Sequence, residues 1–376
     1  MSIVIIGTGM AGYSLAREIR KADAEVQLVM ITADNGYSYP KPALSNALIQ
    51  GKQPEQIISA DAATMAERLN AVIHTHTKVT AVDSNAHSVE TDTAGVISYD
   101  QLVLATGARP IRLPFKGNAA DDLLSVNDIE EYTAFRASLE DAERIAIIGP
   151  GLIGCEFAND LAASGRSVTV IGPDPHPIST LLPEQAGKAL QRGLSEIGIE
   201  WKLGTVAESI NKADRGYELT LANGDKVQAD VMLSAIGLKP ELTLAEKIGL
   251  KTERGIVTDR FLATSQPDIY ALGDCAEVEG KNLPYVMPLM IGARALAKTL
   301  TGTPTEVIYP VMPVVIKTPA HPIVVASAPR EAKGEWEINA TAKGTKCCFK
   351  SADGTVLGFA LTGDAVEEKA ALLKVM

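Results

Sequence analysis

The sequence predicts an α/β protein made of two units built on parallel sheets, followed by a small α+β unit at the C-terminal end. Three features of the sequence support this prediction. The same order of strand, glycine-rich turn, helix and strand occurs twice in the 376 residues. The strands of both copies are apolar along their whole length, as expected when a parallel sheet is covered on both faces. After residue 309 the pattern changes to clustered prolines and short strand-like segments.

The first copy of the repeated arrangement lies at the start of the chain. Residues 3–6 form a short apolar run rich in β-branched residues, which favours a buried strand. A glycine-rich turn follows directly, then a helical stretch over residues 13–21 and a second buried strand over residues 26–32. The residues of this turn are Gly7, Thr8, Gly9, Met10, Ala11 and Gly12.

The second copy repeats this order in the middle of the chain. We expect a strand over residues 145–148, a helix over residues 155–164 and a strand over residues 168–171. The turn between the first strand and the helix contains Gly149, Gly151, Leu152, Ile153 and Gly154. Because both turns stand between a buried strand and a helix, we expect two dinucleotide sites. Tight turns without a ligand are the alternative.

Each glycine of such a turn has a mechanical role. The first allows the tight turn out of the strand, the second lets the backbone approach a pyrophosphate, and the third lets the helix pack closely on the strand. The N-terminus of the helix then offers free N–H groups and partial positive charge to the phosphates. A nicotinamide transfers a hydride, whereas a flavin accepts a hydride and releases electrons singly. Two sites in one chain therefore suggest transfer from one cofactor to the other.

An acidic residue about 20 positions after each turn is expected to bind a ribose. Asp34 and Asp174 come nearest to this position, although either could be an ordinary loop aspartate. Residues 172–175 contain no Arg or Lys to bind a 2′-phosphate. The sequence therefore favours NADH over NADPH.

Composition excludes several classes of function. A formal net charge of −11 argues against nucleic-acid binding, which needs a basic face. No apolar stretch reaches the roughly 18 residues of a membrane span, and the N-terminal apolar run is too short for a signal peptide. Four cysteines show neither metal-ligand spacing nor a disulfide framework, so we expect no metal site and a cytoplasmic protein.

Three further segments carry a family resemblance. Residues 101–110 and 233–240 look like linker motifs, and residues 264–276 look like a second FAD motif in which Asp274 would bond the ribityl chain. Together with the two turns, these segments resemble the two-dinucleotide-binding flavoprotein reductases of the glutathione-reductase superfamily. The resemblance covers nearly the whole chain and implies two Rossmann-like domains. It adds Thr106, Gly107, Gly237 and Gly273 to the expected cofactor-binding residues.

A narrower resemblance concerns the electron acceptor. Residues 37–45, 285–297 and 314–319 are similar to elements of rubredoxin–NAD⁺ reductases and their flavorubredoxin reductase relatives. This resemblance implies that NADH reduces FAD, and that single electrons then pass to rubredoxin, a small iron–sulfur carrier. An alkane monooxygenase would be the final acceptor. The implied FAD contacts are Ala33, Asp34, Lys41, Val79, Glu156, Asp274, Val286 and Lys317.

Three of these residues are expected to tune the flavin. Lys41 is either a cation near the flavin or a solvated loop lysine, and Lys317 either donates to the flavin or reaches solvent. Glu156 is either an acid that faces the cofactors and pairs with Lys41, or a partner of the helix dipole in the first helical turn. No side chain is expected to act as catalytic acid, base or nucleophile.

The resemblance also implies a division of the chain into domains. Residues 1–113 and 241–312 would bind FAD, residues 114–240 would bind NAD, and residues 313–376 would form the C-terminal domain. In the last of these we expect strands over residues 336–340, 345–350 and 356–361, and a helix over residues 364–375.

Rival functions differ in where the electrons go. A ferredoxin reductase would use the same chemistry with another carrier. An NADH oxidase or coenzyme A-disulfide reductase would need a redox cysteine beside the flavin, and residues 33–48 contain none. A redox-sensing protein would hold NADH without rapid turnover. The sequence leaves the docking surface and the oligomeric state open.

Overall fold

A computed structural model describes all 376 residues, which fold as two compact units. The first unit consists of Met1–Pro40, Ile58–Arg109 and Leu238–Pro310. The second consists of Lys41–Ile57, Pro110–Gly237 and Val311–Met376. Residues 41–57, assigned above to the FAD-binding domain, therefore pack with the second unit, and the C-terminal residues belong to that unit as well.

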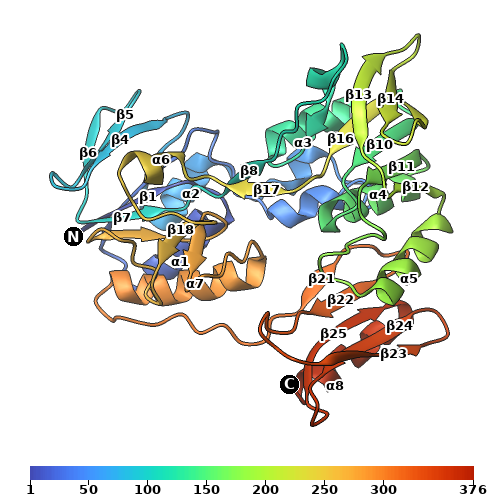
Figure 1. Cartoon of the computed structure of the whole chain (residues 1–376). Coiled ribbons are helices and arrows are strands. Elements are labelled where there is room, and N and C mark those ends of the chain that lie inside the picture. Colours follow the sequence, from blue (N-terminus) through green and yellow to red (C-terminus); the bar gives the residue numbers. More distant parts are fainter. The chain divides into compact units, whose positions relative to one another are not determined.

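A five-stranded parallel sheet forms the centre of the first unit, with the strand order β19-β7-β1-β2-β3. Helices α1 and α7 lie side by side against this sheet (Figure 1). The strands are β1 (Ser2–Ile6), β2 (Gln27–Ile31), β3 (Val72–His74), β7 (Gln101–Leu104) and β19 (Ile269–Ala271), and the helices are α1 (Met10–Ala22) and α7 (Val286–Leu300). Because the central strand β1 is apolar throughout, it is buried from Ile3 onward.

Smaller elements complete the first unit. An antiparallel sheet consists of β4 (Val79–Asp83), β5 (Ser88–Thr91) and β6 (Val96–Ser98). Two strand pairs are β8 (Ala108–Pro110) with β17 (Leu238–Pro240), and β18 (Ile256–Thr258) with β20 (Ala276–Val278). Two short helices are α2 (Ala62–Leu69) and α6 (Thr243–Lys247).

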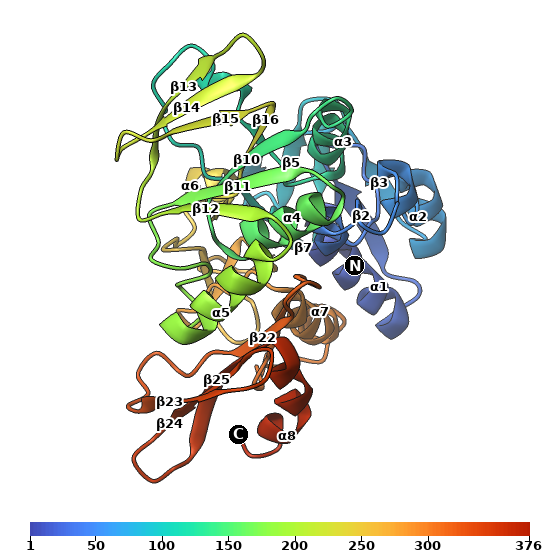
Figure 2. The same ribbon diagram turned by 90° about the vertical axis from the view of Figure 1, so that its right-hand side faces the viewer.

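The second unit contains a matching parallel sheet, with the order β12-β11-β10-β16-β9. Its strands are β9 (Leu124–Ser125), β10 (Arg144–Ile148), β11 (Ser167–Gly172), β12 (Ile199–Leu203) and β16 (Val231–Ser234). Its helices are α3 (Ile129–Ser138), α4 (Leu152–Ala163) and α5 (Glu184–Ser195). An antiparallel sheet at one end consists of β13 (Ala207–Lys212), β14 (Tyr217–Leu221) and β15 (Lys226–Ala229) (Figure 2). The prediction of two similar α/β units is confirmed.

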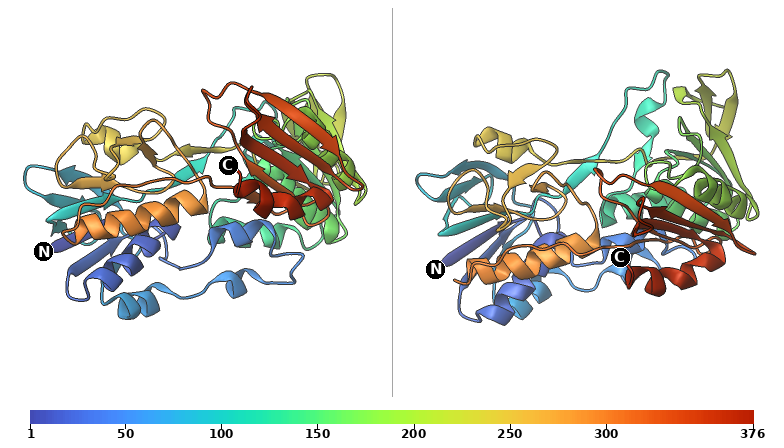
Figure 3. Two further views of the ribbon diagram at one scale, coloured as in Figure 1. Left: turned by 90° about the horizontal axis from the view of Figure 1, so that it is seen from below. Right: turned by 60° about the horizontal axis from the view of Figure 1, so that its bottom comes forward.

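The C-terminal residues form a further sheet of the second unit, with the order β21-β22-β25-β24-β23. The strands are β21 (Val314–Ile316), β22 (Ile323–Ala326), β23 (Glu335–Ala340), β24 (Thr345–Lys350) and β25 (Val356–Thr362). Helix α8 (Lys369–Leu373) lies along one side of this sheet (Figure 3).

The prediction of a single helix over residues 364–375 is wrong. Residues Gly363–Glu368 form a 3₁₀ helix and α8 follows it. Asp364 accepts hydrogen bonds from the Thr341 hydroxyl and, at 3.3 Å, from the Lys343 amide. These bonds hold the first turn against the loop between β23 and β24, where a tighter helix fits.

Three shorter 3₁₀ helices also lie in the second unit. They cover Lys41–Ser45, Pro54–Ile57 and Ala120–Asp122. Across the whole chain, no helix combines the length and the apolar character that crossing a membrane requires.

Candidate functional site

The first glycine-rich turn leaves strand β1 with a backbone that requires glycine. Gly7 has a φ of +110°, and a Cβ there would overlap the carbonyl oxygen of Ala105. A Cβ at Gly12 would overlap the carbonyl oxygen of Gly7, so that glycine lets α1 approach the turn. Gly9 caps α1 and would have only open space around a Cβ. The turn is thus closed by protein on the strand side and open at the helix N-terminus.

The second turn has the same construction. Gly149 has a φ of +116°, and a Cβ there would overlap the carbonyl oxygen of Ala235. A Cβ at Gly154 would overlap the carbonyl oxygen of Gly149, whereas Gly151 faces open space. The first turns of α1 and α4 contain no acidic residue, and neither N-cap has a side-chain hydrogen bond. Both turns therefore leave N–H groups and positive dipole ends available, which fits a pyrophosphate at each.

The two candidate ribose residues differ in their surroundings. Asp34 Oδ1 accepts hydrogen bonds from Thr32 Oγ1 at 2.7 Å, from the Gly36 amide at 2.8 Å and from Thr8 Oγ1 at 3.5 Å. Because Thr8 belongs to the first turn, Asp34 lies beside that turn. The carboxylate of Asp174 instead accepts from the Ser179 hydroxyl, within the loop that follows β11.

The other expected residues of the first unit lie on several of its elements. Thr106 Oγ1 donates to the Glu241 carbonyl at 3.0 Å, and the Gly107 carbonyl accepts from the Glu241 amide at 3.0 Å. A Cβ at Gly273 would lie 2.8 Å from the Ala11 Cβ, so the segment that carries Asp274 passes close to α1. Ala33 follows β2, Val79 begins β4, and Val286 begins α7.

A buried charged cluster occupies the second unit. Glu156, only 1% exposed, accepts a hydrogen bond from Ser45 Oγ at 2.6 Å and from the Lys317 amide at 2.8 Å. The Lys317 ammonium also forms an ion pair with its carboxylate. Glu156 is the fifth residue of α4, so it lies in the second turn and is not the first-turn dipole partner considered above.

Lys41 binds a partner other than the one suggested by the sequence. Its ammonium donates to Asn127 Oδ1 at 2.6 Å, within the second unit. The ion pair of Glu156 is with Lys317. Gly237, in the same unit, has a φ of +114° and accepts a hydrogen bond from the Ile111 amide at 3.0 Å.

Sequence reasoning missed several polar residues of this cluster. Ser45, Asn127, Asn159 and Asp160 were not singled out, although the last two are almost fully buried. The available signal was the run of polar residues 156, 159 and 160 within a helix that is otherwise apolar.

The four cysteines are free and buried. Burial raises the pKa of the Cys155 and Cys275 thiols, and raises that of Cys347 to about 11. These thiols are therefore poor nucleophiles at neutral pH. No group of three or more His, Cys, Asp or Glu side chains is placed to hold a metal ion.

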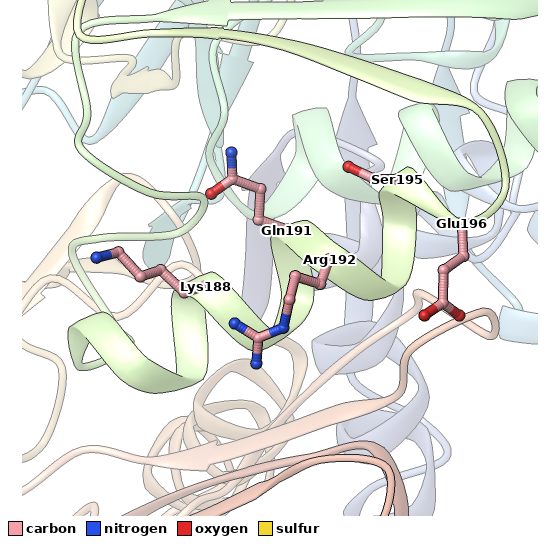
Figure 4. A pocket seen from close by; sticks show the side chains of 5 residues that line it. All are labelled: Lys188, Gln191, Arg192, Ser195 and Glu196. Atoms are coloured by element: carbon pink, nitrogen blue, oxygen red, sulfur yellow. The ribbon is translucent and has the colours of Figure 1, made fainter.

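A shallow surface pocket lies along helix α5 (Figure 4). It is lined by Lys188, Gln191, Arg192, Ser195 and Glu196. None of the residues expected to bind a cofactor lines this pocket, so the candidate site does not include it.

Comparison with known proteins agrees with this geometry. Residues 1–295 match the family model described as pyridine nucleotide-disulphide oxidoreductase, and residues 306–376 match that of a rubredoxin binding C-terminal domain. The chain is 47% identical to a rubredoxin-NAD(+) reductase of Alcanivorax borkumensis, over 99% of this chain and 97% of that one. It is 48% identical to a rubredoxin-NAD(+) reductase of Acinetobacter baylyi, over 96% and 94% of the two chains.

A solved structure has the same fold. The ferredoxin reductase of Rhodopseudomonas palustris matches with a TM-score of 0.88 and 24% identity, over 98% of this chain and 93% of that one.

Proposed function

Because the chain belongs to the pyridine nucleotide-disulphide oxidoreductase family, we propose that it passes electrons from NADH through bound FAD to a rubredoxin. The observation that carries this proposal is the presence of two glycine turns of identical construction in one chain. The match of the C-terminal residues to a rubredoxin-binding family and the names of the two similar relatives favour rubredoxin as the acceptor. The likeness to a ferredoxin reductase supports the fold alone.

We assign FAD to the first turn and NADH to the second. The residues proposed for FAD are Gly7, Thr8, Gly9, Met10, Ala11, Gly12, Ala33, Asp34, Val79, Thr106, Gly107, Gly273, Asp274 and Val286, and those proposed for NADH are Gly149, Gly151, Leu152, Ile153, Gly154 and Gly237. When bound, the nicotinamide supplies a hydride and the flavin supplies a store of two electrons that can leave singly.

The chain itself acts by binding and by electrostatics. The N–H groups of α1 and α4 bind phosphate, and Lys41, Glu156 and Lys317 are proposed to tune the charge that the flavin experiences. All four cysteines are unpaired and buried, and burial raises the pKa of the Cys155 and Cys275 thiols, which argues against a cysteine as an intermediate electron carrier. A disulfide reductase or a cysteine-dependent oxidase is therefore disfavoured.

Further parts of the proposal concern domains and cellular setting. We propose that residues 1–113 and 241–312 bind FAD, residues 114–240 bind NADH and residues 313–376 bind the iron protein. Four free cysteines favour the cytoplasm. An alkane monooxygenase downstream of rubredoxin stays a prediction from the resemblance.

The test follows the flavin spectrum in two steps. The purified protein should show flavin absorption bands that bleach when NADH is added without oxygen. In a stopped-flow experiment, oxidised rubredoxin should restore the bands faster than a ferredoxin does. A colourless protein that cannot be reconstituted with FAD would contradict the proposal. Faster reoxidation by ferredoxin would mean that ferredoxin, and not rubredoxin, is the electron acceptor.

A further inference from the structure

Helix α4 carries three buried polar side chains on one face. Glu156, Asn159 and Asp160 are 1%, 1% and 2% exposed. Asn159 and Asp160 follow Glu156 by three and four residues, so each of them lies next to Glu156 on the helix surface. The helix that begins at the second glycine turn thus presents a polar face to the interior of its own unit.

This face binds two segments that lie far apart in the sequence. Asn159 Oδ1 accepts a hydrogen bond from the Ala320 amide at 3.1 Å, three residues beyond Lys317. Asp160 accepts from the Leu48 amide at 3.1 Å through Oδ2 and from the Ile49 amide at 2.8 Å through Oδ1. Asp160 therefore holds the segment 41–57, which begins with Lys41.

The same segment has two additional anchors in the second unit. Ser45 donates to Glu156, and the Arg136 guanidinium of α3 donates to the Lys52 carbonyl at 2.9 Å. Asp160 binds the amides of residues 48 and 49, which lie along the chain between the two anchored residues 45 and 52. With both oxygens bound to successive backbone amides, it restrains the direction of the backbone as well as its position.

Stability alone gives a poor account of a carboxylate at position 160. Burial raises the pKa of Asp160, and the two amide hydrogen bonds, together with the nearby charges of Arg136 and Lys317, only partly offset that rise. Asp160 also lies in the last turn of α4, where the helix dipole disfavours negative charge. A buried carboxylate that forms no ion pair is costly, so its presence at this position points to a role in placement.

We propose that Asp160 is a positioning residue that fixes the segment carrying Lys41, while Asn159 does the same for the segment carrying Lys317. The effect on catalysis rests on the proposed function, because it requires Lys41 to act on the flavin. The structural effect on the segment does not depend on the proposed function. Asp160 would act through the backbone of residues 48 and 49 and would not touch a cofactor.

The test compares Asp160→Ala with Asn159→Ala, a matched variant on the same face that releases the other segment. Hydrogen exchange followed by mass spectrometry should become at least tenfold faster in residues 41–57 of Asp160→Ala, with residues 311–320 unchanged. Asn159→Ala should show the reverse pattern. This readout needs neither cofactor nor turnover.

Kinetics provide the second readout. Asp160→Ala should slow flavin reduction by NADH about tenfold, because small displacements of a positioning group are costly, with KM for NADH changed less than twofold. Asp160→Asn, which keeps one acceptor oxygen, should recover part of the rate and serves if the alanine variant does not fold. Unchanged exchange in residues 41–57, or exchange that rises equally across the chain, would overturn the proposal. If the unmodified protein failed to reduce rubredoxin, the proposed function would fall while the exchange result would still stand.

Discussion

At the scale of single residues, the two glycine turns show how little side-chain volume the site tolerates. Gly7 and Gly149 combine a positive φ with a neighbouring carbonyl oxygen, of Ala105 and Ala235 respectively, where a Cβ would stand. An L-residue would therefore meet both backbone strain and steric overlap. The two costs can be separated, because other glycines of the chain have the strain without the overlap.

Gly149→Ala tests the second turn. We expect the dissociation constant of NADH to rise at least tenfold, because overlap with the Ala235 carbonyl shifts the turn. The same overlap should lower the free energy of unfolding by about 1–3 kcal/mol. The FAD content should stay unchanged. Gly165→Ala is the control, since Gly165 has a φ of +91° and open space for a Cβ. NADH titrations that cannot distinguish the two variants would contradict the assigned role.

Glu156→Gln tests the buried ion pair with Lys317. The variant keeps the volume but leaves the Lys317 ammonium, whose side chain is 27% exposed, without its counter-charge. We expect the free energy of unfolding in urea to fall by about 3 kcal/mol, the lower end for breaking a buried pair, since Lys317 is partly exposed. Adding Lys317→Met should restore part of the loss. A single variant as stable as the unmodified protein would show that the charge pair contributes nothing.

At the scale of secondary structure elements, the sequence predicts what depends on neighbours along the chain. The strands at residues 3–6 and 145–148 lie within β1 and β10, because an apolar run before a glycine turn is a local signal. The partners of the polar face of α4 could not be predicted. The partners of Glu156 lie 111 and 161 residues away, at Ser45 and Lys317, and no local pattern encodes such a pairing.

The prediction of a single C-terminal helix was wrong for a related reason. Its composition favours an α-helix, but tertiary hydrogen bonds to Asp364 decide the geometry of its first turn. The packing of residues 41–57 with the second unit likewise depends on distant groups, the Arg136 donor of α3 and the Asp160 acceptor of α4. The glycine motifs thus predicted the two tight turns between strand and helix, whereas the arrangement of the charged cluster required the structure.

The N-terminal ends of the paired strands β10 and β16 allow a prediction about pH. Asp230 accepts hydrogen bonds from the side chain and amide of Arg144, and these bonds hold its pKa well below the ordinary value near 3.8. A depressed carboxyl pKa stabilises the folded state above the unfolded pKa, and this contribution is lost as the pH falls toward the folded pKa. Asp230→Asn should therefore be less stable than the unmodified protein at pH 6, with a difference that shrinks below pH 4. Urea unfolding at both pH values measures this, and a difference that grows on acidification would contradict it.

At the scale of the whole molecule, charge decides how an electron carrier approaches. The chain has a formal net charge of −11. A rubredoxin that is also acidic would be repelled at long range, so salt should assist the encounter by screening that repulsion. Two oppositely charged partners would show the reverse dependence.

The bimolecular rate of rubredoxin reduction should therefore rise as ionic strength increases from about 10 mM to about 150 mM, over which the Debye length shortens from roughly 30 Å to roughly 8 Å. The rate of flavin reduction by NADH in the absence of rubredoxin serves as the control, because it separates effects on the carrier encounter from effects on the first half-reaction. A rubredoxin rate that falls steadily with salt would instead mean that a local basic surface dominates over the net charge. In that case, replacing single surface arginines or lysines of the C-terminal residues would locate the docking surface by the change in salt dependence.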